Sequence, residues 1–197
     1  RIYEERTFRT GANWPTVWTR DIAYATHLGL GMWNVQACMK SLQARVRKGE
    51  VEQDTGTGGS WPISSDRVVW SVAAWEAYCL TGDGDWLLRA SRVLEKTCLK
   101  DEKGLTATGG LMRGESSFLD WREQSYPAWM TSADIGDSSS LSTMILHAAA
   151  RKMLARMFRE RGMEGKAREW DGKGEARSGG IEKFFRIPGS ELYGQYL

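Results

Sequence analysis

The sequence of 197 residues predicts an all-α fold. Apolar residues recur at helical spacing in six segments, which form pairs joined by short turns that contain glycine. Alternating patterns typical of strands are nearly absent, and residues 50–53 are the one candidate extended piece. We therefore expect three helical hairpins, over residues 20–48, 65–99 and 138–185, each made of antiparallel helices.

The first hairpin is predicted to begin at Thr19, which can cap a helix with Ile22, Ala25 and Leu28 on one face. Its second helix is expected over residues 34–46 and closes near Gly49.

The second hairpin is predicted to start with Ser64 or Ser65 as the cap and to turn at Gly82. Its second helix begins near Asp83 or Asp85 and runs to about residue 99. The loops over residues 50–64 and 105–136 are expected to meet at one end of the hairpins.

The third hairpin is predicted to start with Asp137 or Ser138 as the cap and to turn at Gly162. Its last helix, over residues 164–185, is expected to be frayed or split, because each glycine in a helix interior costs about 1 kcal/mol relative to alanine. The glycines concerned are Gly172, Gly174, Gly179 and Gly180.

Composition limits the classes of function. The net charge is +2, and no basic stripe coincides with a nucleic-acid-binding motif, so nucleic acid is not an expected partner. No apolar run approaches the roughly 18 residues of a membrane helix, so no membrane partner is expected. No spacing of cysteines or histidines is typical of a metal site, and no cofactor is predicted.

Several residues are expected to have structural roles only. Buried free thiols are expected at Cys38, Cys79 and Cys98, and both histidines, His27 and His147, are expected to be buried with satisfied polar atoms. The basic stretch over residues 151–161 is expected to be a solvated helix face.

Two helix starts share one layout, in which tryptophan precedes a charged first turn. The first reads Trp18-Thr19-Arg20-Asp21, and the second runs from Trp61 to Asp66-Arg67. Indole rings stack on the C–H faces of sugars, and charged groups bind the hydroxyls, so we interpret both starts as facing one sugar site. The alternative is that the two aspartates only stabilise the helix N-termini through the helix dipole. The candidate ligands are Trp18, Arg20, Asp21, Trp61, Asp66 and Arg67.

A third candidate segment runs from Gly114 to Trp129 and combines carboxylates, an arginine and aromatic rings without a helical or strand period. Such composition in a long loop indicates function rather than disorder. Rings beside carboxylates suit a sugar, so this loop is a candidate carbohydrate-active site, with Glu115, Trp121 and Arg122 as candidate sugar ligands.

These motifs resemble the glucoamylase-like six-hairpin glycosidases. Trp18-Thr19-Arg20-Asp21 before an apolar helix is similar to their Trp-Thr-Arg-Asp segment, and two further stretches, Asp66-Arg67-Val68-Val69-Trp70 and residues 114–123, resemble members of the wider group, including bacterial enzymes of unclear substrate. The resemblance implies an (α/α)6 barrel, a toroid of six helical hairpins. About half of that barrel fits in this chain, so residues 1–197 are expected to be part of a single, longer catalytic domain.

The resemblance also implies roles for single residues. Arg20 and Asp21 are implied to bind hydroxyls of the sugar in the cleaved subsite. Glu123 aligns with the general acid of the family's Asp-Leu-Trp-Glu-Glu motif, although here the tryptophan comes one place earlier and Gln124 replaces the second glutamate. A related branch uses an aspartate as the acid in this loop, which leaves Asp120 as the alternative.

The expected activity is therefore hydrolysis of an oligo- or polysaccharide, with inversion at the anomeric carbon. Cleavage needs a second carboxylate, which the resembling enzymes take from a late hairpin. We thus expect the isolated chain to be inactive and the remainder of the same polypeptide to be its partner. A non-catalytic sugar-binding remnant, a phosphorylase and an epimerase remain alternatives. A periplasmic or secreted location fits the resemblance.

Overall fold

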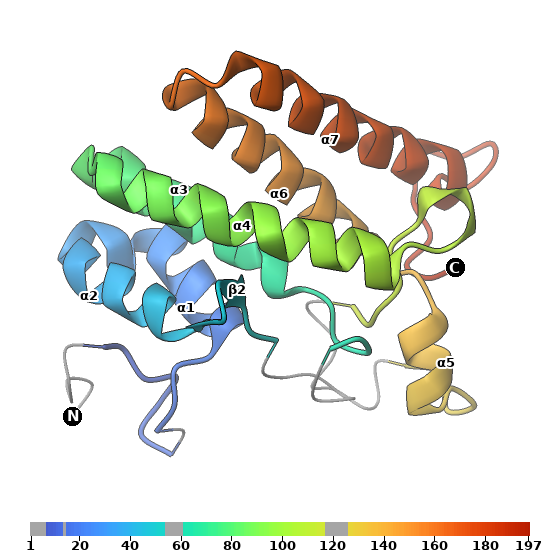
Figure 1. The fold of residues 1–197 in the computed structure, drawn as a ribbon. Coiled ribbons are helices and arrows are strands. Elements are labelled where there is room, and N and C mark those ends of the chain that lie inside the picture. The colour runs from blue at the N-terminus through green and yellow to red at the C-terminus, as the bar shows by residue number, and fades with distance from the viewer. Residues whose placement is uncertain (1–6, 14, 54–60, 117–125) are drawn as a thin grey trace.

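The computed structural model describes residues 7–13, 15–53, 61–116 and 126–197. Its fold is mostly helical, with three helical hairpins lying side by side (Figure 1). The first hairpin contains α1 (Thr19–Ala25), a π-helical turn (Thr26–Leu30) and α2 (Gly31–Ala44). The second contains α3 (Trp70–Thr81) and α4 (Gly84–Leu105), and the third contains α6 (Leu141–Glu160) and α7 (Glu164–Phe185). The predicted three hairpins are confirmed at this level.

Shorter elements connect the hairpins. Strands β1 (Val46–Arg47) and β2 (Glu50–Val51) pair antiparallel in a small hairpin, where the sequence indicated only an extended piece. A 3-10 turn, Arg67–Val69, leads into α3, and another, Thr108–Gly110, follows α4. A further short helix, α5 (Ser132–Asp137), precedes α6.

The middle hairpin contains the centre of the core. Helix α3 contacts α1, α2, α4 and α6, so it joins the first hairpin to the third. Trp70 on α3 is buried; its indole N–H donates to the carbonyl of Leu42 on α2 at 3.0 Å, and its ring lies 6.0 Å from that of Trp86 on α4. Burying large aromatic side chains of this kind contributes strongly to stability.

Local signals located the ends of several helices correctly. Gly82 adopts the left-handed conformation after α3, and the Asp83 carboxylate accepts from the backbone N–H of Trp86 at the start of α4. Asn34, the predicted start of the second helix, interrupts the regular helix of α2, and its side chain accepts from the N–H of Ala37 at 3.0 Å.

The predicted caps of α1, α3 and α6 were wrong. Thr19 is the first residue of α1 instead of its cap, and its hydroxyl donates to the carbonyl of Glu52. Ser64 and Ser65 precede the 3-10 turn and bond to another loop, and α6 begins after Ser140 instead of after Asp137 or Ser138. In each case a long-range partner or a preceding element outweighs the local capping preference.

The last helix is also different from the prediction, because α7 is continuous from Glu164 to Phe185. It packs along α6, and Gly174 allows close approach there: a Cβ at this position would lie 2.8 Å from Cγ of Lys152. Packing against α6 therefore offsets the cost of the glycines, as tertiary contacts commonly override helix propensity.

Three expectations about exposure were wrong. Cys79 is exposed, and His27 lies at the surface beside Glu76. Arg151, at the start of the expected solvated stretch, is fully buried.

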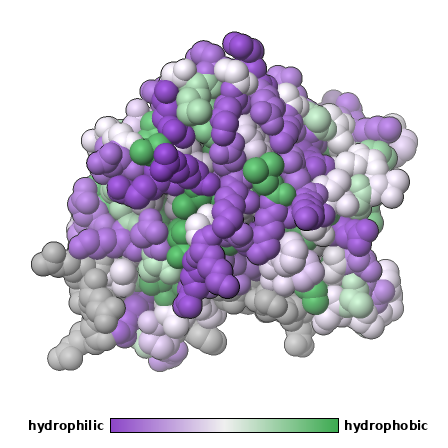
Figure 2. Space-filling model, viewed as in Figure 1, coloured by the Kyte–Doolittle hydropathy of each residue, from purple (hydrophilic) through white to green (hydrophobic). Residues whose placement is uncertain are grey.

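Outside the core, exposed apolar side chains gather near the turn between α1 and α2, where Leu28, Met32 and Trp33 are 80%, 81% and 70% exposed. The face over α4 and α7 that Figure 2 shows is instead mostly hydrophilic.

Candidate functional site

The two tryptophan-containing motifs meet at a partly buried ion pair. Nη1 of Arg20, in the first turn of α1, lies 2.9 Å from Oδ2 of Asp66, which precedes α3. The other oxygen of Asp66 accepts from the side-chain amide of Gln53 at 2.7 Å, and Asp66 is only 2% exposed. The sequence-predicted convergence of the two helix starts is thus present in the structure, and Gln53 is a member that the sequence did not indicate.

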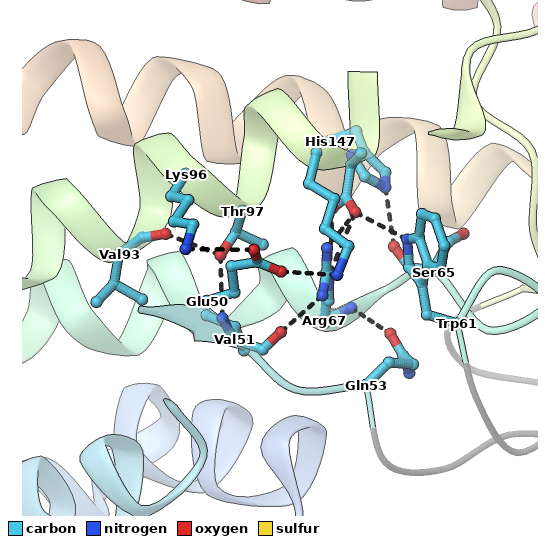
Figure 3. Close-up of polar contacts among 12 residues, drawn as sticks. Glu50, Val51, Gln53, Trp61, Ser65, Arg67, Val93, Lys96, Thr97 and His147 are labelled. Atoms are coloured by element: carbon cyan, nitrogen blue, oxygen red, sulfur yellow. Dashed lines mark hydrogen bonds and ion pairs between the residues drawn. The ribbon is translucent and has the colours of Figure 1, made fainter. Parts of the chain in front are cut away.

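The adjacent residue, Arg67, is directed into the protein (Figure 3). Its Nη2 lies 2.6 Å from Oδ1 of Asp101 on α4, and its Nη1 donates to the carbonyl of Val51 at 2.8 Å. Trp61 donates its indole N–H to the same Asp101 oxygen at 3.0 Å. Burial raises the pKa of Asp101, while Arg67 and Trp61 act to lower it. Arg67 and Trp61 therefore have protein partners for these donors, and Asp101 brings both residues to α4.

Two glycines allow this arrangement because a side chain would not fit. A Cβ on Gly104 of α4 would lie 2.5 Å from the ring of Trp61, so glycine lets the indole lie on the helix. Gly114 has φ +128°, and a Cβ there would lie 1.8 Å from Oγ of Ser65. The segment after α4 can therefore lie directly against residues 63–65.

Glu115 follows that glycine and is buried against the same segment. Its carboxylate accepts from the hydroxyl of Ser64, and its backbone N–H donates to the carbonyl of Ile63 at 2.9 Å. Its own carbonyl accepts from the hydroxyl of Thr143 on α6 at 2.5 Å. The loops after β2 and after α4 thus converge, as predicted, at the end of the hairpins where α3 and α6 begin.

Behind this segment, the carbonyl of Ser65 is bonded to His147 of α6. The distance from Nε2 of His147 is 2.8 Å, so Nε2 carries the proton and donates. Arg151 lies 3.4 Å from the other ring nitrogen and donates to the His147 carbonyl at 2.8 Å. Burial, aided by the Arg151 charge, places the pKa of His147 well below its usual value, so this buried histidine is neutral.

A cavity of about 310 Å³ opens beside α1 and contains two of the predicted ligands, Trp18 and Asp21. Asp21 reaches the surface, but partial burial of its carboxyl raises its pKa. The charge of Arg20 acts in the opposite direction. The walls are aromatic and aliphatic, and the rings of Phe8 and Trp33 lie 6.0 Å apart. The complete lining is Phe8, Arg9, Thr10, Trp18, Asp21, Ile22, Ala25, Leu30 and Trp33.

Most of this lining is not evident from the sequence. Phe8 and Trp33 belong to no motif, and only the fold of the first hairpin brings them to Asp21. Apolar walls with a few polar groups are typical of small-molecule sites. The arrangement offers aromatic faces on which a ring can pack, and the Asp21 carboxylate and Thr10 can bind its hydroxyls.

The candidate catalytic residues Asp120 and Glu123, with Trp121 and Arg122, lie outside the described residues. Within the described part of the chain, no group of three histidine, cysteine, aspartate or glutamate side chains is placed to ligate a metal ion. No helix in that part is long and apolar enough to span a bilayer. Comparison with models of protein families and with curated protein sequences gives no match.

Proposed function

We propose that this chain forms the sugar-binding part of a glycoside hydrolase built on a six-hairpin (α/α)6 barrel. The observation that carries the proposal is the Arg20–Asp66 ion pair, which joins the two tryptophan-containing motifs beside a cavity lined by Trp18 and Asp21. A volume of about 310 Å³ is at the lower end of the range of ligand pockets, as suits a single sugar ring.

In this proposal, Glu123 protonates the leaving glycosidic oxygen, and Asp120 is the alternative acid. Asp21 and Arg20 are assigned to the sugar hydroxyls, and Asp66, with Gln53, holds Arg20 in place. The reaction inverts the anomeric carbon. A carbohydrate-binding protein without catalysis, a phosphorylase and an epimerase remain the competing classes. An epimerase is less well supported, because His147 is buried and neutral and His27 lies at the surface on α1's π-helical extension.

Binding is tested by titrating the chain with a panel of α- and β-linked oligosaccharides, followed by tryptophan fluorescence and calorimetry. Asp21→Asn should weaken sugar binding by about tenfold to hundredfold, because hydrogen bonds to charged groups contribute about 1.5–3 kcal/mol. It should not lower the melting temperature at pH 7, because the raised pKa shows that the fold disfavours the charged form.

Asp85→Asn is the matched control, since Asp85 also lies in the first turn of a helix, α4, and is exposed. Its replacement should leave sugar binding unchanged. Equal losses in the two variants, or no binding of any sugar by the unaltered chain, would contradict the proposed site.

Catalysis is tested with the full-length protein on the same glycosides. Glu123→Gln should lower turnover by about 10² to 10⁴, the usual contribution of a positioned general acid. Asp120→Asn should have a smaller effect, and the reverse ranking would give Asp120 the role of the acid. The first-formed anomer, followed by NMR, reports inversion. Sugar binding without turnover would support the non-catalytic alternative.

A further inference from the structure

A second cavity, of about 430 Å³, lies beside the small β-hairpin and is rich in cationic side chains. Arg47, Lys48, Arg67 and Lys100 line it with Glu50 and Glu52, and Nζ of Lys96 lies 3.6 Å from Oε1 of Glu50. This lining is polar and charged, unlike the aromatic lining of the first cavity. The two cavities therefore suit different parts of a ligand, or different ligands.

Arg67 is paired with Asp101, and the two carboxylates that line the cavity, Glu50 and Glu52, do not cancel the charge of the other cations. Lys100 lies 2.8 Å from Glu50, so two lysines share that one carboxylate, and Arg45 and Arg47 likewise share Glu52. Figure 3 shows Glu50 between Lys96 and Arg67.

The effect of these charges is visible in Glu50. Burial acts to raise the pKa of its carboxyl, but the hydrogen bond from Lys100 and the charges of Lys100, Arg67 and Lys96 lower it below its usual value. An anion entering the cavity would meet the same positive potential.

The second cavity is connected to the proposed sugar site by one row of hydrogen bonds. Gln53 lines the cavity and donates to Asp66, and Asp66 accepts from Arg20. Asp21, the next residue along α1, lines the first cavity.

We propose that the second cavity binds an anionic group, a carboxylate, sulfate or phosphate, and that the sugar of the proposed function carries it, so that the substrate class is an acidic saccharide. The sugar half of this inference rests on the proposed function; the anion site itself does not. Lysine ammonium groups bind such anions through charge-assisted hydrogen bonds. Free inorganic anions have the same chemistry and are separated from an acidic sugar by the experiment.

The experiment compares four probes by calorimetry and by NMR of the backbone amides at residues 47–53. They are inorganic sulfate, the tightest neutral sugar of the oligosaccharide panel, and the uronate and sulfated derivatives of that sugar. The anionic derivatives should bind about tenfold tighter than the neutral sugar, and the preference should weaken as salt is added. Lys100→Gln and Lys48→Asn should each remove most of the preference. Lys48 has φ +51°, a conformation that asparagine tolerates well.

Lys103→Gln is the matched control, because Lys103 is an exposed lysine on the same helix, α4, and does not line the cavity. Equal affinity for neutral and anionic sugars, with no effect of sulfate, would overturn the anion site and leave the proposed function standing. Sulfate binding that depends on Lys100, without binding of any sugar, would retain the anion site and overturn both the acidic-saccharide assignment and the proposed function. Binding of none of the probes would overturn all of them.

Discussion

At the scale of single residues, buried polar groups determine the position of the segment that carries Asp66. In this segment, the carbonyl of Ser65 accepts from His147 and the hydroxyl of Ser65 donates to the carbonyl of Arg113. The next residue after Asp66, Arg67, is ion-paired with Asp101. Buried polar groups cost free energy unless they are paired, so each of these contacts excludes alternative positions of the segment. Asp66 is therefore presented to Arg20 by a pre-organised backbone.

The state of His147 predicts how stability depends on pH. Its pKa in the folded chain is well below the usual 6.5, so the unfolded chain binds a proton that the folded chain does not. Above about pH 6.5 His147 is neutral in both states and costs no stability. As pH falls below that value, the free energy of unfolding should decrease by up to about 1.4 kcal/mol per pH unit. Urea unfolding between pH 5 and pH 7.5 measures this slope.

His147→Gln should make that slope shallower by up to about 1.4 kcal/mol per pH unit, the contribution of one bound proton. The side-chain amide of the glutamine can still donate to the carbonyl of Ser65. His27→Gln is the control: about half of the His27 side chain is exposed, and surface ion pairs such as His27–Glu76 contribute little. An unchanged slope in the His147 variant would show that this histidine is not the group responsible.

At the scale of elements, α7 shows how a helix forms against its own propensity. Gly174 lies against α6, whereas Gly179 is exposed and a Cβ built on it meets no atom within 4 Å. The first glycine thus permits helix packing, and the second contributes only the entropy cost of glycine. A sequence count treats the two as equal, which is why the expected split of this helix was wrong.

The two glycines should respond oppositely to the same substitution. Gly179→Ala should raise the free energy of unfolding by about 0.5–1 kcal/mol, because alanine has the higher helix propensity and meets no atom. Gly174→Ala should give no gain or a loss, because its methyl group would press on Lys152. Denaturant unfolding of both variants measures the difference, and equal gains would show that α6 and α7 are not as close as described.

At the scale of the whole molecule, one hydrophobic cluster extends through all three hairpins. It includes Ile22 of α1, Trp70 of α3 and Trp170 of α7. A smaller cluster, with Leu105 and Phe185, lies where α4 and α7 end. Because α3 joins the first hairpin to the third, we expect the hairpins to unfold together.

Trp70→Ala should lower the free energy of unfolding by about 3–5 kcal/mol, as large-to-small changes in a core do. Amide hydrogen exchange should then become faster in all three hairpins. The Trp70 ring bonds to α2 of the first hairpin and contacts α4 of the second, and its helix α3 contacts α6 of the third. Trp129→Ala is the control: Trp129 is 74% exposed, so its loss should change stability by less than about 0.5 kcal/mol. Faster exchange confined to one hairpin would contradict the shared core.

The sequence by itself determined the helical class, the three hairpins and the turns at Gly82 and Gly162, because helix period and glycine at a helix end are local properties. It also indicated that the helix starts with Arg20 and Asp66 lie together, as their ion pair shows. It did not identify α5, although Thr131 and Asp134 form a capping box that three-residue spacing could have shown.

The tertiary structure alone decided which partners these residues have. Arg20 and Asp66 are 46 positions apart, and Arg67 and Asp101 are 34 apart, so no local pattern pairs them. The same is true of Phe8 and Trp33 in the first cavity and of Lys48 and Lys100 in the second. Side chains acquire such partners only when hydrophobic burial has packed the hairpins, because that packing fixes which buried polar groups can be paired.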